Sequence, residues 1–461
     1  MQLRFSQDTV LFDTVFTTIG STTKLLKVYN DADQPLMISK IRLEGGNASN
    51  YRINVDGEPG TSFNDVSIEP EDSLFIFVEV TIDPGVSNLP FIVEDQVVFE
   101  TNGNTQFVQL ASWGQNANFH GSLDAITTLP CDDVWNPDLP HVIYGIVAVD
   151  EDCKLIINPG TQIYCHKGAG IIVFRGCLEV QGALNNEVIF QGDRLEPEFQ
   201  ELPGQWGIEL EFEFEDQFGV QSATVARGGI WFLEAADSRI DYAVMRNGTI
   251  GIQADTMKNA GVEVVQVTNT KIDNMSGIGL LGRGAIMSGH NNLVTNCGRA
   301  CGAFTLGGSY QFEHCTFANY WSDATRQEPS FVLNNFFAVN NQVFVRPLDN
   351  TEFKNCIMWG NNASLTDFNE FSVAIETDEF VPPAEYFFNN CSVDTDIDLT
   401  DPVFFNGMVN AQTPPFESPS GGDFHLSNNL SIWGGTSTTV VLDLDGVFRT
   451  FPPTRGCYQF Q

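Results

Sequence analysis

The chain has 461 residues, of which 59 are Asp or Glu and 22 are Lys or Arg, so its formal net charge at pH 7 is −37. Nucleic acid and anionic lipid are bound by clustered Lys and Arg, so this charge excludes both as partners and opposes unassisted binding of polyuronates. The length predicts two or three domains, and an apolar content of 42% excludes wholesale disorder.

The sequence carries no sign of a membrane span. No apolar run reaches the roughly 18 residues that a transmembrane helix needs. The opening Met1-Gln2-Leu3-Arg4 lacks the apolar stretch of a signal peptide, so we expect a mature fragment with an added start Met. Ten cysteines are scattered without a CxxC metal pattern, and Cys297 and Cys301 are the one close pair. We expect most of them to be buried thiols, with one or two disulfides.

Residues 1–117 consist of short stretches that alternate apolar and polar side chains, separated by turn residues. The clearest stretches are residues 24–29, 36–41, 74–80, 91–99 and 107–110. About seven strands in roughly 110 residues are typical of a β-sandwich. This segment resembles the Hydin-type immunoglobulin-like domains in a series of short motifs: Asp13-Thr14-Val15-Phe16, Pro35-Leu36-Met37-Ile38, Ile68-Glu69-Pro70 and Thr101-Asn102. The resemblance implies an immunoglobulin-like sandwich that acts as a spacer or a protein-contact module.

Residues 118–139 are expected to form a linker or cap, and the pattern changes at about residue 140. From there, strands of three to five residues end in Gly or Asn turns, as in Ile157-Asn158-Pro159-Gly160-Thr161. No stretch is long enough for a crossover helix, so parallel strands can only be joined by the turns of a solenoid.

A repeat supports the solenoid. An apolar residue recurs shortly before Asn274, Asn296, Asn319, Asn340 and Asn361, which follow one another at a nearly constant spacing. A second polar position precedes each: Asn269, Asn291, His314, Asn335 and Asn355. We predict coils of about 22 residues with the first set of Asn stacked at one corner, because Asn tolerates left-handed backbone and can bond along a stack. His314 is expected to take the place of an Asn.

These features resemble right-handed parallel β-helix proteins. Residues 155–194 are similar to their opening coils, and the tail with Asp401-Pro402 and Asp443-Leu444-Asp445-Gly446 is similar to their closing segment. The stretches 13–21 and 307–321 resemble β-helix lipoproteins of Bacteroidetes outer membranes. The resemblance implies an all-β protein with an immunoglobulin-like sandwich over 1–117, a right-handed parallel β-helix over 140–400, and C-terminal coils and a cap over 401–461. It also implies display at the outer-membrane surface through a lipid anchor, although the lipid-bearing Cys of that family is missing here.

Few side chains suggest chemistry. Glu209, Glu211 and Glu213 alternate with apolar residues, which predicts either a solvated strand face or a Ca²⁺ site, since hard cations prefer carboxylates. Calcium is the one cofactor that the pattern permits. Trp206, Tyr320 and Trp321 are candidate ligand contacts, with core or turn positions as the alternative.

Two functions remain open. The first, which we expect, is a non-catalytic surface protein, monomeric by itself, that binds a protein partner or a glycan in an outer-membrane complex. The second is a carbohydrate-active enzyme, a polysaccharide lyase or a glycosidase. A glycosidase needs two carboxylates about 5–9 Å apart, which the sequence alone neither provides nor excludes.

Overall fold

A computed structural model describes residues 2–17, 20–83, 91–216, 219–256, 261–339, 342–361, 368–428 and 431–460, without the side chains of 211–223. Within these ranges the protein is all-β, as expected, with helical structure limited to four short 3₁₀ turns: η1 (Gly46–Ala48), η2 (Pro197–Phe199), η3 (Pro419–Gly421) and η4 (Ser431–Trp433). A search of the described residues finds no helix with the length and hydropathy of a membrane span. The chain divides into two compact units, residues 1–118 with 195–199, and residues 119–194 with 200–461.

The first unit contains two five-stranded sheets. One has the order β1 (Arg4–Phe5), β3 (Lys24–Tyr29), β8 (Ser73–Val80), β5 (Tyr51–Val55), β6 (Glu58–Gly60). The other has the order β2 (Thr9–Phe16), β10 (Asn104–Gln115), β9 (Phe91–Thr101), β4 (Leu36–Leu43), β7 (Ser62–Ile68). The pairings are antiparallel except that of β2 with β10. Alternate residues of both sheets, such as Ile76 and Phe99, enter one apolar core because successive side chains of a strand point to opposite faces.

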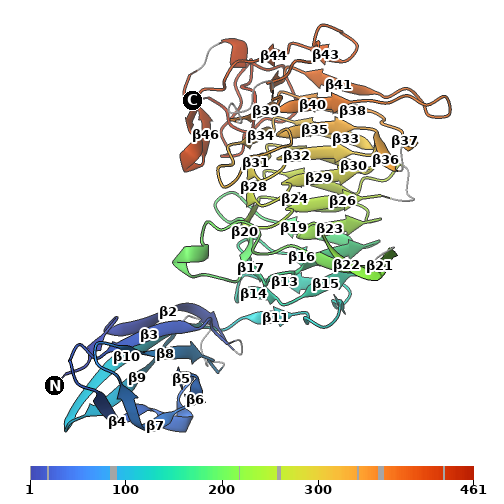
Figure 1. Cartoon of the computed structure of the whole chain (residues 1–461). Helices are drawn as coiled ribbons and strands as arrows, with labels where there is room; N and C mark the ends of the chain where they lie inside the picture. The colour runs from blue at the N-terminus through green and yellow to red at the C-terminus, as the bar shows by residue number, and fades with distance from the viewer. Residues whose placement is uncertain are drawn as a thin grey trace. The chain divides into compact units, whose positions relative to one another are not determined.

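The second unit is a solenoid of three long parallel sheets, which we call sheets I, II and III in the order in which each coil visits them (Figure 1). Sheet I contains β12 (Thr127–Thr128), β15 (Ile146–Val149), β18 (Gly170–Phe174), β23 (Ile230–Leu233), β26 (Ile252–Asp255), β29 (Leu280–Arg283), β32 (Gly302–Thr305), β35 (Phe331–Asn334) and β40 (Phe371–Ala374). Sheet II contains β13 (Asp133–Trp135), β16 (Lys154–Ile157), β19 (Cys177–Gln181), β24 (Ser238–Asp241), β27 (Val265–Thr268), β30 (Ile286–His290), β33 (Ser309–Glu313), β38 (Thr351–Lys354), β41 (Tyr386–Asn389) and β43 (Phe405–Asn406). Sheet III contains β11 (Asn118–His120), β14 (His141–Ile143), β17 (Gln162–Cys165), β20 (Val188–Gly192), β25 (Ala243–Arg246), β28 (Lys271–Met275), β31 (Leu293–Cys297), β34 (Thr316–Asn319), β39 (Ile357–Gly360), β42 (Ser392–Val393) and β44 (Val409–Asn410).

The coils vary in length. In the middle of sheet III, Ile272, Val294 and Phe317 are successive partners, and the steps between them match the predicted repeat. An earlier step in this sheet, from β20 to β25, is much longer because the hairpin of β21 (Glu209–Asp216) and β22 (Gly219–Ala226) is inserted. The step after them, from β34 to β39, contains the hairpin of β36 (Phe336–Val339) and β37 (Gln342–Val345). The predicted coil length is therefore one of several, and the last coil is shorter, since Phe388 pairs with Phe405 and Ser392 with Val409.

The corner between sheets II and III is nearly uniform. From β24 onward one left-handed residue stands there in each of six successive coils: Tyr242, Asn269, Asn291, His314, Asn355 and Asn390, with φ between 45° and 55°. The strands on either side place these residues one above another, since Thr268 pairs with His290 and His290 with Glu313. We call this row the corner ladder. Its side chains bond along the stack, for example Asn291 Nδ2 to Asn269 Oδ1 at 3.0 Å.

The C-terminal strap, residues 431–460, packs on the outer face of sheet III. Trp433, Cys457 and Tyr458 share an apolar cluster with Ile357 and other outward side chains of that sheet. The preceding hairpin of β45 (Phe416–Ser418) and β46 (Asp423–Leu426) joins the same cluster. Both faces of strands β34 and β39 are consequently buried.

The strap also bonds to the corner ladder. Asn355 Nδ2 donates to the carbonyl oxygen of Thr436 at 2.7 Å, and Asn355 Oδ1 accepts from the backbone of Thr436 at 2.8 Å. His314 Nδ1 lies 3.2 Å from the carbonyl oxygen of Thr454, and Arg449 Nη2 donates to Asn291 Oδ1 at 2.7 Å. The corner ladder therefore binds the C-terminal strap to coils that precede it by many residues in the sequence.

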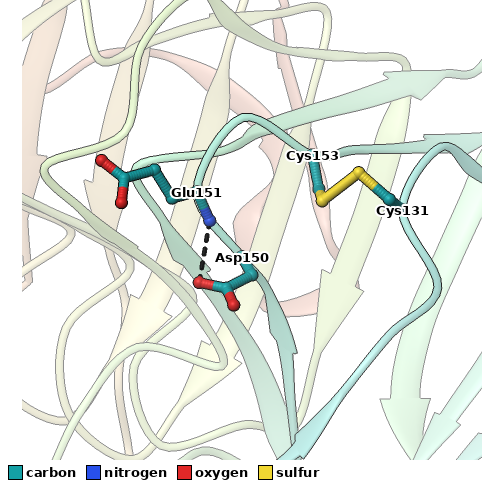
Figure 2. The surroundings of a disulfide bond; sticks show 4 residues. All are labelled: Cys131, Asp150, Glu151 and Cys153. Atoms are coloured by element: carbon teal, nitrogen blue, oxygen red, sulfur yellow. Dashed lines mark hydrogen bonds between the residues drawn. A yellow bond between two sulfur atoms is a disulfide. The ribbon is translucent and has the colours of Figure 1, made fainter.

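One disulfide, Cys131–Cys153, connects adjacent coils just before β13 and β16 (Figure 2). Its Cα atoms are 4.8 Å apart, the spacing of neighbouring strands. The other eight cysteines are free thiols; seven are buried, and Cys177 is half-buried. Cys297 and Cys301 are thus not joined to each other, and burial raises the pKa of the Cys297 thiol well above its usual value.

Candidate functional site

A groove of about 550 Å³ lies on the outer face of sheet II, where the strap forms one wall. Its floor comes from β27, β30 and β33, whose outward side chains alternate with buried ones such as Val267, Met287 and Phe312. Strap residues 439–442 supply the wall. The groove thus exists because each strand exposes one polar face and the strap crosses beside it.

Tyr242 departs from the pattern of the corner ladder and lines the groove. Left-handed backbone is common for Asn, but for a bulky residue it is an outlier that costs about 1–2 kcal/mol. Tyr242 has φ 45° and is half-buried, with burial raising the pKa of its hydroxyl. An aromatic side chain held at such a position is the kind of strained feature that clusters at functional sites.

The groove floor carries neutral hydrogen-bonding side chains in one row. Gln266, Ser288 and Gln311 are consecutive partners on β27, β30 and β33, so about 4.8 Å separates each from the next. Gln266 Nε2 donates to Ser288 Oγ at 3.4 Å, and Gln311 Nε2 donates to the carbonyl oxygen of Asn350. The row presents amide and hydroxyl groups at a repeat of about one strand spacing, which suits an extended polymer with many hydroxyls.

A second row beside it holds the charges. His290 pairs in register with Glu313, which pairs with Lys354, and Lys354 Nζ lies 3.5 Å from a Glu313 oxygen. Burial lowers the pKa of His290, so its ring is neutral at pH 7. Further down the same row, Asp241 Oδ1 accepts from Thr268 Oγ1 and from Asn269 Nδ2, both at 2.8 Å. Glu313 is the carboxylate that lines the groove itself.

Carboxylate spacing limits the chemistry of the groove. Asp241 and Glu313 belong to one row but are three strands apart, roughly 14 Å at the strand spacing, too far for the acid–base pair of a glycosidase. Glu352 is nearer, because it lies one strand beyond Gln311, on a diagonal from Glu313. That diagonal is about 7–8 Å between backbone positions. Glu313 and Glu352 are therefore the carboxylates whose placement fits an inverting pair.

The predicted Ca²⁺ site is described only in part. Glu209 is exposed on the solenoid hairpin, opposite Ala226 of β22. The side chains of Glu211 and Glu213 lie outside the described residues. Among the parts of the chain that are described, no group of three or more His, Cys, Asp or Glu could hold a metal ion. A Ca²⁺ site on this strand stays a prediction.

The predicted aromatic contacts are placed differently from one another. Trp206 is 1% exposed and donates through Nε1 to the carbonyl oxygen of Arg246 at 2.8 Å, so its predicted role as a ligand contact is wrong. Tyr320 is half-buried under the C-terminal hairpin, where its ring packs against Phe416 and Phe424. Trp321 is half-exposed beside it. None of the three lines the groove.

The predicted Asn set is brought together in part. Asn274, Asn296 and Asn319 follow in-register residues of β28, β31 and β34, and their side chains each bond to the coil before, as in Asn296 Nδ2 to Asp273 Oδ1 at 2.8 Å. Gly360, not Asn361, is the partner of Asn319. Asn340 lies outside the described residues, and the strand before it, β36, pairs with β37 rather than with a neighbouring coil. The last two spacings of the set thus do not correspond to coils.

The groove residues were not predicted from the sequence. Gln266, Ser288 and Gln311 recur at the same step as the Asn set, and this periodicity could have placed them on one face. Tyr242 could have been found as the aromatic member of the second polar set, one coil before Asn269. Residues 439–442, which form the wall of the groove, belong to no repeat, so nothing in the sequence places them beside the floor.

Comparisons with known proteins add little. No family model and no curated protein matches the chain. Among solved structures, the Agl-KA catalytic domain matches with 10% identity and a TM-score of 0.32 over 81% of this chain and 76% of that one. The catalytic domain of a GH87 alpha-1,3-glucanase with bound tetrasaccharides matches with 9% identity and a TM-score of 0.26 over 80% and 81%. A family 123 glycoside hydrolase from Clostridium perfringens matches with 10% identity and a TM-score of 0.18 over 24% of this chain and 26% of that chain. We base no conclusion on likeness at these scores.

Proposed function

We propose that the protein binds carbohydrate, and that the groove on sheet II holds a neutral glycan chain. The observation that carries the proposal is Tyr242, an aromatic side chain in left-handed backbone at the groove, where the other residues of the corner ladder are Asn or His. An aromatic ring offers a flat apolar face to a sugar ring, and strained backbone of this kind clusters at ligand-binding sites.

The remaining lining fits the same ligand. Gln266, Ser288 and Gln311 offer amides and a hydroxyl to sugar hydroxyls, at one strand spacing from each other. A neutral glycan is favoured over a polyanion in this groove, since its described lining contains the carboxylate of Glu313 and no Lys or Arg. Of the two ligands expected from the sequence, a protein partner and a glycan, the groove thus favours the glycan. Catalysis requires a separate test.

The test replaces Tyr242 by the residue that the ladder normally uses. Tyr242→Asn should fold at least as stably as the wild type, because Asn is suited to left-handed backbone. It should lose affinity for the bound glycan at least tenfold, about 1.4 kcal/mol, in a glycan-array screen followed by calorimetry. Tyr242→Phe keeps the ring and is the matched control, with affinity within about twofold. Equal binding by wild type and Tyr242→Asn would contradict the proposal.

Hydrolysis is the second candidate function, and the diagonal placement of Glu313 and Glu352 favours it. Glu313 would lie at the substrate, and Glu352 one strand away, at a separation that suits inversion of configuration. Neutral oligosaccharides that the array identifies should then be cleaved by the wild type and not by Glu313→Gln or Glu352→Gln. Binding without cleavage by the wild type would leave the protein a binding module. Cleavage that persists in both variants would exclude this pair.

We also infer the finer architecture and the location from the sequence resemblance. The first unit would be an immunoglobulin-like spacer of the Hydin type, and the solenoid would be right-handed, as parallel crossovers almost always are. The protein would be a lipoprotein displayed at a Bacteroidetes outer-membrane surface, in a complex that handles glycans. Proteolysis of whole cells tests the location, and protection of the protein until lysis would argue against surface display.

A further inference from the structure

A second cluster of polar side chains lies on sheet I, which does not contribute to the groove. Trp231 of β23, Gln253 and Asp255 of β26, and Arg283 of β29 occupy three successive strands, where Trp231 pairs with Gln253 and Asp255 with Arg283. Arg227 follows β22 directly and reaches the same place, with its guanidinium 5.5 Å from the centre of the Trp231 ring. We call these five residues the sheet I cluster.

The cluster is organised around Asp255. Its Oδ2 accepts from Trp231 Nε1 at 3.0 Å and from Gln253 Nε2 at 2.9 Å, and Arg283 Nη1 lies 3.7 Å from the same oxygen. Gln253 is 1% exposed, and its Oε1 accepts from the backbone of Gly228 at 3.0 Å, which holds the chain leading to Arg227. Gln253 thus holds the backbone next to Arg227, and Asp255 lies within ion-pair distance of Arg283.

The charges of the cluster do not balance among the described residues. Two guanidiniums face one carboxylate, in a chain with only 22 basic residues against 59 acidic ones. Burial and the neighbouring charge of Arg283 lower the pKa of Arg227, as expected for two cations brought close together. Such a pair is unfavourable unless an anion joins it.

Buried polar atoms in the cluster also lack partners. In the described part of the chain, Asp255 Oδ1, Arg227 Nε and the neighbouring Thr256 Oγ1 are buried and make no hydrogen bond. Buried polar atoms are nearly always satisfied, because leaving one bare forfeits its hydration without replacement. Arg227 Nε is an unused donor and Asp255 Oδ1 an unused acceptor, which matches a ligand that carries both an oxyanion and hydroxyls.

We propose that the sheet I cluster binds the anionic group of an acidic saccharide, a sugar carboxylate or sulfate. The oxyanion lies between Arg227 and Arg283, a sugar hydroxyl donates to Asp255 Oδ1, and the Trp231 ring contacts the sugar. Guanidinium groups pair with carboxylate and sulfate through two parallel N–H donors. The net charge of −37 does not prevent this, because salt screens charges more than roughly 8–10 Å away. This site is separate from the groove on sheet II and does not depend on the function proposed for it.

Calorimetry with three probes tests the site: a uronate oligosaccharide, a sulfated oligosaccharide and a neutral oligosaccharide of equal length. The wild type should bind at least one charged probe, at least tenfold more tightly than the neutral one. Raising the salt concentration tenfold should weaken that binding. The two charged probes distinguish carboxylate from sulfate as the group that is bound. Binding of neither charged probe, or equal binding of the neutral one, would overturn the proposal.

Variants locate the binding. Arg283→Gln and Arg227→Gln should each lower the affinity for the charged probe at least tenfold, whereas Arg239→Gln, at an exposed site on sheet II, should leave it unchanged. The Nε–Hε resonance of Arg227 should shift on titration, which shows contact without relying on affinity. Unchanged affinity in both Arg variants would place the binding elsewhere, and Tyr242→Asn should have no effect on it.

Discussion

The first and the last coils of the solenoid are held together in different ways. Among the first, β13 and β16 are joined by Cys131–Cys153, and the corner after β19 is a loop that contains Gly182 and Asn185. From β24 onward the corner shrinks to one or two residues, one of which has left-handed backbone, and the strap bonds to the ladder that these left-handed residues form. A covalent link thus stabilises one end, and a polar row bound by a distant segment stabilises the other.

The difference shows how a solenoid can protect its ends. Each coil depends on its neighbours, so the outer coils are the first to separate unless something else holds them. The disulfide acts mainly by restricting the unfolded chain, whereas the strap acts by satisfying buried polar groups in the folded one. The two ends should therefore respond to different perturbations, and the following predictions separate them.

The largest effect should come from Arg455, which is 4% exposed and donates to the carbonyl oxygens of Cys391 at 2.7 Å and Gly407 at 2.9 Å. Arg455→Met removes the donors and leaves buried carbonyls bare, which should cost roughly 3–5 kcal/mol in the free energy of unfolding. Urea denaturation measures it. The exposed Arg239→Met should change stability by no more than about 0.5 kcal/mol. A loss no larger than that of this control would show that the strap does not hold the last coils.

Loss of the disulfide should rank second. Cys131→Ser with Cys153→Ser removes a link across a sequence separation of 22 and should cost about 3 kcal/mol by the chain-entropy relation. Amide exchange should accelerate in β13 and β16 and stay unchanged in the strap. Acceleration in both regions would mean that the two ends are coupled.

Asn355 tests the polar ladder directly. Asn355→Ala should cost about 2 kcal/mol, because it leaves the backbone of Thr436 without its two partners and puts Ala at φ 55°. Asn355→Gly relieves the backbone strain but not the lost bonds, so it should fall between the wild type and Ala. Thermal unfolding of the three proteins ranks their stabilities. If Asn355→Gly is as stable as the wild type, the loss in Asn355→Ala comes entirely from backbone strain and not from the lost hydrogen bonds.

The smallest effect should appear at His425, which lies between Asp423 at 2.7 Å and Asp445 at 3.0 Å and stacks on Tyr458. The bonds to Asp445 and Asp423 raise its pKa to about 8 from an ordinary value of 6.5. The charged form is favoured in the folded state, so its stabilisation is complete below pH 6.5 and is lost as the pH rises through 8. The Tm difference between wild type and His425→Gln should therefore be larger at pH 6 than at pH 9. A pH-independent difference would contradict a stabilising charge on His425.

Sequence reasoning identified the all-β class and the solenoid, because period-two strands and recurrent corner residues are local signals. It missed coil lengths wherever an insertion occurs, since Asn340 and Asn361 continue the spacing numerically while the chain between Asn319 and Asn361 contains the hairpin of β36 and β37. For Trp206 it left a ligand contact and a core or turn position open, and the burial of the residue supports the core position. The groove could not be predicted from the sequence, because its wall comes from the strap, which lies far along the chain from the strands of the floor.

The three corners of the solenoid differ in how much extra chain they accept. Long connections occur between sheets III and I, where residues 193–229 intervene, and between sheets I and II, where residues 335–350 do. The corner between sheets II and III carries no comparable connection from β24 to β44 in the described chain, because a left-handed residue bonded to its neighbours leaves no place for one. Foreign sequence grafted at the first two corners should thus be tolerated without shifting the strands. A protein engineer could use them to display a peptide or a folded domain while the third corner keeps every coil in step.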